Sequence, residues 1–194
     1  MAETNSNSGV TVTPLRLSLE LRDRLERSLL LFYTGSARNA ASILAGQRKA
    51  SEDEDPQVIH ALHGIKADAY AMRDALEAGR LRSVGEILHE SWQRKKKLAK
   101  GVSTPELDRL YQVALEHGAV GGKITGAGGG GFLLMYCEPE YHGAVTRALE
   151  AEGVARLTFH FDDGGAQVLV NSMPHVTGLT YPEGRWIVTG VASA

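Results

Sequence analysis

A run of glycines in the second half of the chain is the segment whose residue types point most directly to chemistry. Five of six consecutive residues are glycine: Gly126, Ala127, Gly128, Gly129, Gly130 and Gly131. Glycine adopts positive φ without strain and has no Cβ to block a ligand, so successive amides in such a loop can converge on an anion. A glycine-rich hairpin turn without a ligand is the alternative, although two residues would suffice for a turn. The composition therefore predicts a loop that binds a phosphate or a sugar hydroxyl.

The residues around this loop exclude two common nucleotide-binding motifs. The loop matches the spacing G-x-G-x-x-G, but the dinucleotide-binding motif needs a helix after it, and here the apolar strand Phe132–Tyr136 follows. The P-loop pattern G-x-x-x-x-G-K-[ST] fails around Lys123, because His117 replaces its first glycine and Ile124 replaces its Ser or Thr.

Two neighbouring lysines, Lys95 and Lys96, are candidates for contact with a substrate phosphate. Lys95 continues the apolar stripe that begins at Val84, so the helical period places it on the inward side of its helix. An inward cation beside an anion site can pair with phosphate. The alternatives are that the run Arg94–Lys97 is a solvated helix face and that Lys96 stacks on Trp92, one turn earlier.

Arg38, Lys123 and Thr125 complete the set of candidate substrate-binding residues. Arg38 follows the apolar run Leu29–Tyr33 at a predicted strand-to-helix turn, where the amides of a helix N-terminus favour anions. An ordinary surface arginine is the alternative. Lys123 and Thr125 directly precede the glycine loop, so they either contact substrate or only flank the loop.

The elements that must position these residues form a helical half followed by a half with strands. Helices are predicted at 19–25, 39–50, 59–76, 84–98, 105–117 and 141–151, and strands at 29–33, 119–125, 132–136, 157–161 and 166–170. This order predicts an α+β fold, with helices packed on one face of a small, mostly antiparallel sheet.

Two of these helices carry detailed expectations. In the helix after Thr104, that residue is predicted to cap the N-terminus, and Pro105 suits the first helical position. The inward face of this helix is predicted to consist of Leu107, Leu110, Tyr111 and Ala114. The acidic stretch Glu52–Pro56 is predicted to be a loop. The helix after it is expected to bury one apolar stripe: Ile59, Leu62, Ile65, Ala69, Met72 and Leu76.

Composition excludes several classes of function. A net charge of -2 and an aromatic content of 6% argue against a nucleic-acid partner. No apolar run reaches the ~20 residues that span a bilayer, so we expect no membrane association. Cys137 is the single cysteine, which suits a reducing cytoplasm and excludes a cysteine-rich metal site. No other metal-ligand pattern is present, and we predict no metal site.

Residues 121–134 resemble the third conserved motif of the GHMP kinases, which include galactose, homoserine, mevalonate and phosphomevalonate kinases. The four glycines after Gly126-Ala127 are most similar to the branch that phosphorylates D-glycero-D-manno-heptose 7-phosphate and to related fucose kinases. Segments 30–35 with Arg38, 92–98 and 103–108 match in the same order. The resemblance covers roughly residues 13–170.

This resemblance implies a fold and a function. It implies a GHMP kinase C-terminal domain, ferredoxin-like, over 13–170, with 1–12 as a flexible lead-in and 171–194 as a tail that we cannot place. It implies the substrate-side half of an ATP-dependent sugar kinase that uses Mg²⁺ and acts on a sugar phosphate such as D-glycero-D-manno-heptose 7-phosphate. The amides of Gly126–Gly131 would then help to shape the phosphoryl-transfer site.

One departure from the family limits this expectation. The nucleotide-binding loop Pro-x-x-x-Gly-Leu-Gly-Ser-Ser-Ala and the catalytic aspartate of the family's N-terminal half are not visible in this sequence. We therefore expect the catalytic residues and most of the ATP site to come from an N-terminal half, and this chain alone to be inactive. A separate N-terminal half and self-association are the expected partners. The alternative is a non-catalytic sugar-phosphate-binding relic, or one subunit of a split kinase.

Overall fold

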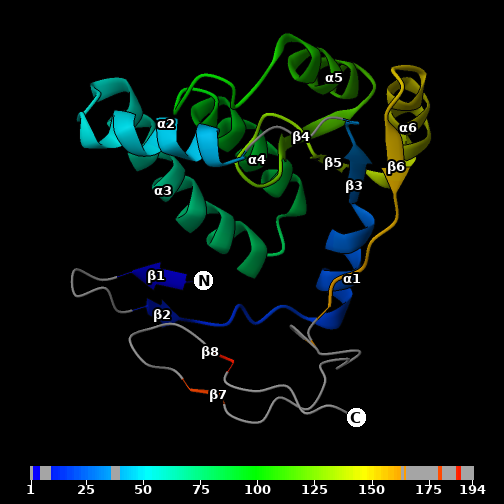
Figure 1. Ribbon diagram of the computed structural model, residues 1–194. Coiled ribbons are helices and arrows are strands. Elements are labelled where there is room, and N and C mark those ends of the chain that lie inside the picture. The colour runs from blue at the N-terminus through cyan, green and yellow to red at the C-terminus, as the bar shows by residue number, and fades with distance from the viewer. Residues whose placement is uncertain are drawn as a thin grey trace, which may run out of the picture. The chain divides into compact units, whose positions relative to one another are not determined.

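Four strands form one antiparallel sheet in the order β4-β5-β3-β6 (Figure 1). The central pair is held in register from Leu29 opposite Tyr136 to Tyr33 opposite Phe132. The strands are β3 (Leu29–Tyr33), β4 (Ala119–Ile124), β5 (Phe132–Cys137) and β6 (Ala155–Leu157). The predicted α+β class and the strands at 29–33, 119–125 and 132–136 are confirmed.

The computed structural model describes residues 2–4, 10–35, 40–162, 164, 179–180 and 187–188. The chain divides into two compact units, Met1–His160 and Phe161–Ala194. In the second unit, β7 (Leu179–Thr180) pairs with β8 (Ile187–Val188). The predicted strand at 166–170 lies outside the described residues.

A third small sheet lies in the segment that was expected to be a flexible lead-in. There, β1 (Ala2–Thr4) pairs in antiparallel fashion with β2 (Val10–Val12). The sequence did not predict this pairing, because the segment is polar apart from Val10 and Val12.

Six α-helices accompany the four-stranded sheet in the described residues. They are α1 (Leu19–Arg27), α2 (Ala40–Glu52), α3 (Pro56–Glu77), α4 (Leu81–Lys95), α5 (Pro105–Glu116) and α6 (His142–Ala151), with a short 3₁₀ helix, η1 (Pro139–Tyr141). Each predicted helix is present. None of the described helices combines the length and the apolar composition needed to cross a bilayer.

One face of the sheet carries the main core. Alternate residues of β3 and β5, including Leu30, Phe32 and Leu133, are buried against residues of α5 and α6. Thr104 caps α5 by accepting a hydrogen bond from the Leu107 amide at 3.2 Å. The inward residues predicted for this helix are all buried: Leu107, Leu110, Tyr111 and Ala114. A second, smaller core forms between α1, α3, α4 and Tyr136 of β5.

The stripe predicted for α3 is partly wrong. Leu62 is exposed, whereas Val58, Ala61 and Ala75 are buried. The polar contact with α4 accounts for this difference, because a guanidinium rather than an apolar side chain fills the middle of the helix pair. Arg94 packs over Gly64, where a Cβ would lie 2.5 Å from its Cδ, and it donates to both carboxylate oxygens of Asp68 at 3.0 Å.

The expectation that 52–56 is a loop is also partly wrong, since α3 begins at Pro56. Asp55 is its N-cap and accepts hydrogen bonds from the amides of Gln57, at 2.8 Å, and Val58, at 3.3 Å. The Asp-Pro pair is therefore a helix start, with proline in the first turn.

The strand predicted at 157–161 is misplaced. β6 comprises Ala155–Leu157, and its pairing with β3 ends at Leu31 opposite Leu157. Beyond that point the chain follows α1 (Figure 1), where the His160 imidazole contacts the Glu26 carboxylate at 2.9 Å. Phe159 is therefore half-buried without belonging to the sheet.

Candidate functional site

The glycine loop connects β4 to β5, with a strand on each side as predicted. Five of its residues have positive φ, from 71° at Gly126 to 139° at Gly130. L-amino acids with a Cβ rarely adopt these conformations, so the loop needs glycine for its path. The dinucleotide-binding alternative is excluded by the structure, because β5 follows the loop directly and no helix begins there.

Two other segments hold the loop in place. The Gly129 amide donates to the carbonyl of Val102 at 2.8 Å, and a Cβ on Gly128 would lie 2.6 Å from the same oxygen. On the other side, the amide and the hydroxyl of Thr34 donate to the Gly131 carbonyl at 2.9 and 3.1 Å. The loop is therefore preorganised by the connection between α4 and α5 and by the residue that follows β3.

Most of the loop's amides have no acceptor among the residues that the structure describes. Among the described residues, the Gly129 amide is the only one of the loop that donates to a protein group. The amides without a protein acceptor in this part of the chain are those of Gly126, Ala127, Gly128, Gly130 and Gly131. Because Gly130 is buried, leaving its N–H without an acceptor costs free energy. An anion in the loop would satisfy these donors.

Lys95 lies against this loop, as its inward position on the helix predicted. Its ammonium donates to the Gly126 carbonyl. Burial, and to a smaller extent the neighbouring charge of Lys123, lower the pKa of Lys95 from 10.5 to about 8. A bound anion would offset the repulsion between the Lys95 and Lys123 ammonium groups, and it would accept hydrogen bonds from the loop amides.

Close backbone contact brings Lys95 to the loop. Gly85 of α4 and Gly121 of β4 meet directly, since a Cβ on Gly121 would lie 2.2 Å from the Gly85 carbonyl oxygen. This contact fixes α4 along β4, so the last turn of the helix reaches the end of the strand. Lys123 is half-buried two residues along the same strand.

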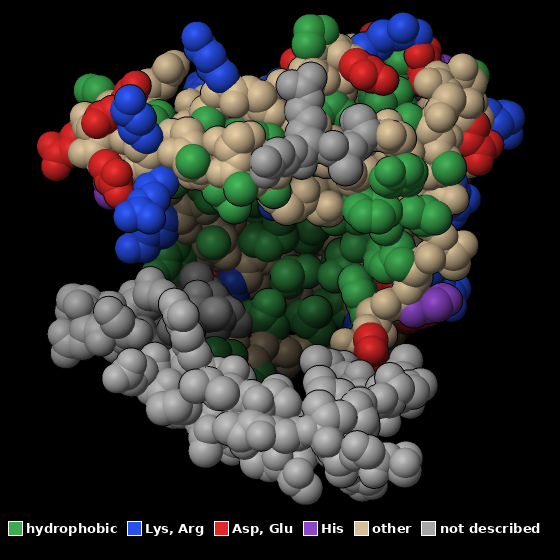
Figure 2. Space-filling view, in the orientation of Figure 1, with side chains coloured by type: hydrophobic (Ala, Val, Ile, Leu, Met, Phe, Trp, Pro, Cys, Tyr) green, Lys and Arg blue, Asp and Glu red, His purple; other side chains and the backbone are tan. Residues whose placement is uncertain are grey.

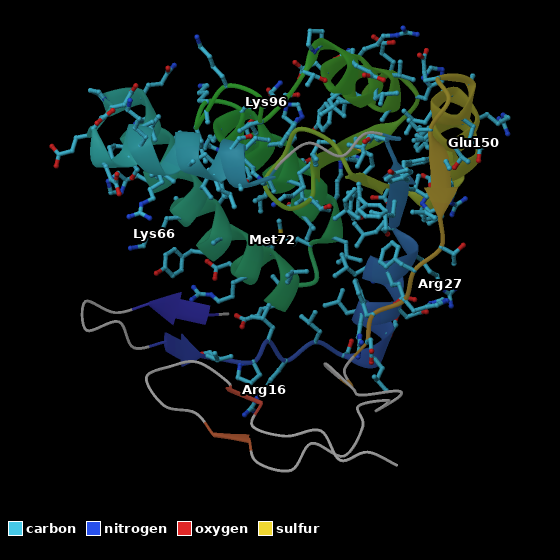
Figure 3. The ribbon with its side chains drawn as sticks, viewed as in Figure 1. Arg16, Arg27, Lys66, Met72, Lys96 and Glu150 are labelled. Carbon is cyan, nitrogen blue, oxygen red and sulfur yellow. The ribbon has the colours of Figure 1, made fainter. Side chains whose placement is uncertain are left out.

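Lys96 and Thr125 make contacts within the protein. The Lys96 ammonium pairs with the Asp108 carboxylate of α5 at 3.2 Å, and the Ser103 hydroxyl donates to the same oxygen at 2.9 Å. Figure 3 labels Lys96 beside the upper helices. Thr125 closes the β4–β5 hairpin, because its amide and its hydroxyl both donate to the Phe132 carbonyl, at 2.9 and 3.3 Å. A substrate contact by either residue stays a prediction.

Arg38 lies outside the described residues, so its predicted contact with phosphate stays a prediction. The described chain before it ends at Gly35, directly after Thr34, which binds the glycine loop.

A family comparison covers the elements that build this site. Residues 72–155 match the model of the family described as "GHMP kinases C terminal". The matched range contains α4, α5, β4, the glycine loop, β5 and α6. This part of the chain is a GHMP kinase C-terminal domain.

Relatives of known name agree with this assignment. The chain is 33% identical over 162 residues to D-glycero-alpha-D-manno-heptose 7-phosphate kinase of Campylobacter jejuni, covering 84% of this chain and 47% of that protein. It is similar in structure to a D-glycero-D-manno-heptose 1-phosphate kinase of Bacteroides thetaiotaomicron, with a TM-score of 0.57 and 28% identity over 82% of this chain and 41% of that one. The chain thus spans about half the length of these relatives.

More distant structures share the fold. Mevalonate kinase of L. major, solved with R-mevalonate, matches 80% of this chain and 47% of its own with a TM-score of 0.65, at 20% identity. The GHMP kinase C-terminal fold is thus retained where the sequence has diverged.

Sequence reasoning missed three residues that support the site in this GHMP kinase domain. Thr34 donates to the Gly131 carbonyl, and the Val102 carbonyl accepts from the Gly129 amide. The sequence did not indicate that either residue holds the glycine loop. Tyr111 was predicted to be buried, and its hydroxyl accepts from the Gly122 amide at 3.1 Å and contacts His89 Nδ1 at 3.0 Å. A buried tyrosine needs a partner for its hydroxyl, so this contact was open to prediction.

The residues present fit the phosphate groups of ATP better than its metal ion. Unpaired amides and the ammonium groups of Lys95 and Lys123 are donors suited to phosphate oxygens. Within the described ranges, no group of three or more His, Cys, Asp or Glu residues is placed to hold a metal ion.

Proposed function

We propose that this chain supplies the substrate-side half of an ATP-dependent sugar kinase that transfers a phosphoryl group to a sugar phosphate. The observation that carries the proposal is the fixed glycine loop, most of whose amides have no acceptor among the described residues, with Lys95 and Lys123 beside it. Phosphoryl transfer depends mainly on positioning and on stabilising charge that spreads over phosphate oxygens. Donors held in place before the substrate arrives provide both.

Each part of the site has a role in this proposal. The amides of Ala127, Gly128, Gly130 and Gly131 bind phosphate oxygens. The charges of Lys95 and Lys123 offset the negative charge of the same group. ATP supplies the phosphoryl group when it is bound together with Mg²⁺.

The nucleotide loop and the catalytic base come from a second half of the kinase fold, on the same polypeptide or on another. An apolar surface beside the glycine loop is suited to receive that half. Tyr33 and Phe132, each 40% exposed, lie opposite each other on β3 and β5 with ring centroids 5.5 Å apart. Leu157 of β6 is 39% exposed. Figure 2 shows hydrophobic side chains gathered over these strands.

A heptose phosphate is the substrate class that the relatives suggest. The two heptose kinases compared above are named for different phosphate positions, 7 and 1. The loop and the two lysines recognise phosphate rather than a particular sugar carbon, so both compounds belong in the test.

The test is phosphoryl transfer by this chain together with the half that carries the nucleotide loop. Labelled phosphate from ATP should appear on heptose 7-phosphate or heptose 1-phosphate. Lys95→Met should reduce the rate at least tenfold, since a hydrogen bond to a charged group contributes about 1.5–3 kcal/mol. Lys66→Met, an exposed lysine of α3, is the matched control and should leave the rate unchanged. No transfer in the reconstituted pair would exclude the kinase role.

A non-catalytic sugar-phosphate-binding protein is the second candidate. It is favoured by the fact that Thr34 and Val102 belong to this chain, so the loop is held without another domain. This candidate predicts that heptose phosphate binds to the chain alone and that ATP does not change its affinity. Calorimetric titration with and without ATP separates the two candidates.

A further inference from the structure

A second basic site lies at the other end of α4 from Lys95. An open cavity of about 410 Å³ lies between the last turn of α1, the first turn of α4 and the end of β5. Its lining includes four arginines and two serines: Arg24, Arg27, Arg80, Arg82, Ser28 and Ser83. Four guanidinium groups around one cavity are unexpected in a chain whose net charge is -2.

Two of the four arginines have no carboxylate partner in the described part of the chain. Arg27 pairs with Asp23 at 2.9 Å. Arg82 lies 3.5 Å from Glu86. Neither Arg24 nor Arg80 forms an ion pair with a carboxylate in the described part of the chain, and Arg80 donates only to a backbone carbonyl, at 3.3 Å. Like charges that converge without counterions are stabilised by an added anion.

The start of α4 adds donors to this cavity. Arg80 is the N-cap residue and its side chain makes no capping hydrogen bond, so no side chain occupies the position before the first-turn amides. These amides carry partial positive charge and favour anions. Glu138 is the carboxylate among the described lining residues, and the buried Tyr136 hydroxyl donates to it at 3.2 Å. Arg24 and Arg80, which pair with no carboxylate among the described residues, therefore share the cavity with one carboxylate that already has a donor.

We propose that this cavity binds the phosphate group of a small molecule, with Arg24 and Arg80 as the principal contacts. Its volume lies in the range of small-molecule pockets, roughly 300–1,000 Å³, and could hold a sugar phosphate or a mononucleotide as well as free phosphate. Planar guanidinium groups bind phosphate through paired hydrogen bonds.

This site is distinct from the glycine loop. Leu81 and Lys95 are the first and last residues of α4, and a helix of that length spans about 21 Å. Figure 3 likewise shows Arg27, which lines the cavity, well away from Lys96. The proposal stands without the kinase function, since it rests on the arginines and the cavity alone.

The test is calorimetric titration of the full chain with three probes: inorganic phosphate, glucose 6-phosphate and AMP. The double variant Arg24→Ala/Arg80→Ala should bind the preferred probe at least tenfold more weakly, because both side chains are exposed and can be removed without disturbing the core. The variant Arg48→Ala/Lys66→Ala removes the same number of positive charges elsewhere and should bind as the parent does. Circular dichroism confirms that each variant is folded.

The three probes separate the sources of the phosphate group. The probe that binds most tightly would identify the ligand class, provided that its binding is lost in Arg24→Ala/Arg80→Ala. Lys95→Met serves as a second reference, because it weakens binding at the glycine loop but should leave this cavity intact. Absence of binding by all three probes, or binding that the arginine pair does not affect, would overturn the proposal.

Discussion

The two ends of α4 offer two different environments for an anion. At its C-terminal end, Lys95 lies against a loop that is held by the hydrogen bond from the Gly129 amide to Val102 and by the hydrogen bonds from Thr34 to the Gly131 carbonyl. At its N-terminal end, exposed arginine side chains line a cavity. The first site is built from main chain and is rigid, whereas the second is built from long side chains that must be ordered by the ligand. The loop therefore suits a site that must place reacting atoms, and the cavity suits simple retention of an anion.

The largest expected effect comes from breaking the main-chain site. Gly128→Ala should abolish sugar-phosphate binding at the loop, since its Cβ would meet the Val102 carbonyl at 2.6 Å at a φ of 104°. Strain of this kind costs about 1–3 kcal/mol. Heptose 7-phosphate titration and thermal melting would measure the two effects.

Gly126→Ala is the matched control for this substitution. Gly126 also has positive φ, 71°, but no atom lies within 4 Å of the position its Cβ would take. It should lose less stability and less affinity than Gly128→Ala. Equal losses in both variants would show that contact with Val102 is not what holds the loop.

Measuring anion affinity against pH distinguishes the two ends of α4, because one end uses lysine and the other uses arginine. The pKa of Lys95 is lowered to about 8, whereas arginine stays charged throughout. Raising the pH from 7 to 9 should weaken binding of a sugar phosphate at the loop several-fold, because the phosphate is already a dianion there and only the lysine loses charge. Phosphate affinity at the arginine cavity should not change. A loop affinity that is flat with pH would mean that the Lys95 charge plays no part.

The lowered pKa of Lys95 also makes the stability of the unliganded protein depend on pH, and stability should rise where the affinity of the loop falls. Its pKa is lower when folded than its ordinary value of 10.5, so between about pH 8 and 10.5 the unfolded chain binds more protons. The free energy of unfolding should therefore rise with pH across this window relative to Lys95→Met. Denaturant melts of the two proteins at pH 8 and pH 10 would measure the difference.

The smallest expected effect concerns the lysine next to it. Lys96 pairs with Asp108 and is partly exposed, so Lys96→Met should change stability by about 0–1 kcal/mol and sugar-phosphate affinity less than twofold. A loss as large as that of Lys95→Met would place Lys96 at the substrate and restore its role as a binding residue.

The fold could be predicted from the sequence where a local pattern, such as a helix cap or an apolar period, agreed with the packing in the structure. Thr104 and Pro105 marked the start of α5, and its apolar period named its buried face correctly. The face of α3 was misjudged because its neighbour contributes Arg94, and a hydrophobic pattern does not reveal a guanidinium packed over Gly64. Contacts between segments decide such faces.

The candidate site likewise has features that could be predicted from the sequence and features that could not. The glycine loop and the inward position of Lys95 follow from composition and helical period. Apart from the hydrogen bond of the Thr34 hydroxyl, the contacts of Thr34 and Val102 with the loop join backbone groups of segments far apart in the chain, and residue type does not encode such contacts. The arginine cavity was missed because its four arginines come from two stretches of sequence that only the fold brings together.

The most direct test of the central claim is an amide chemical-shift titration of the ¹⁵N-labelled chain with heptose 7-phosphate. We expect large shifts for Ala127, Gly128, Gly130 and Gly131, whose amides have no protein acceptor among the described residues. The Gly129 amide, which donates to Val102 at 2.8 Å, should shift least within the loop. A titration that leaves the loop amides unmoved, or that shifts only residues elsewhere, would contradict the account.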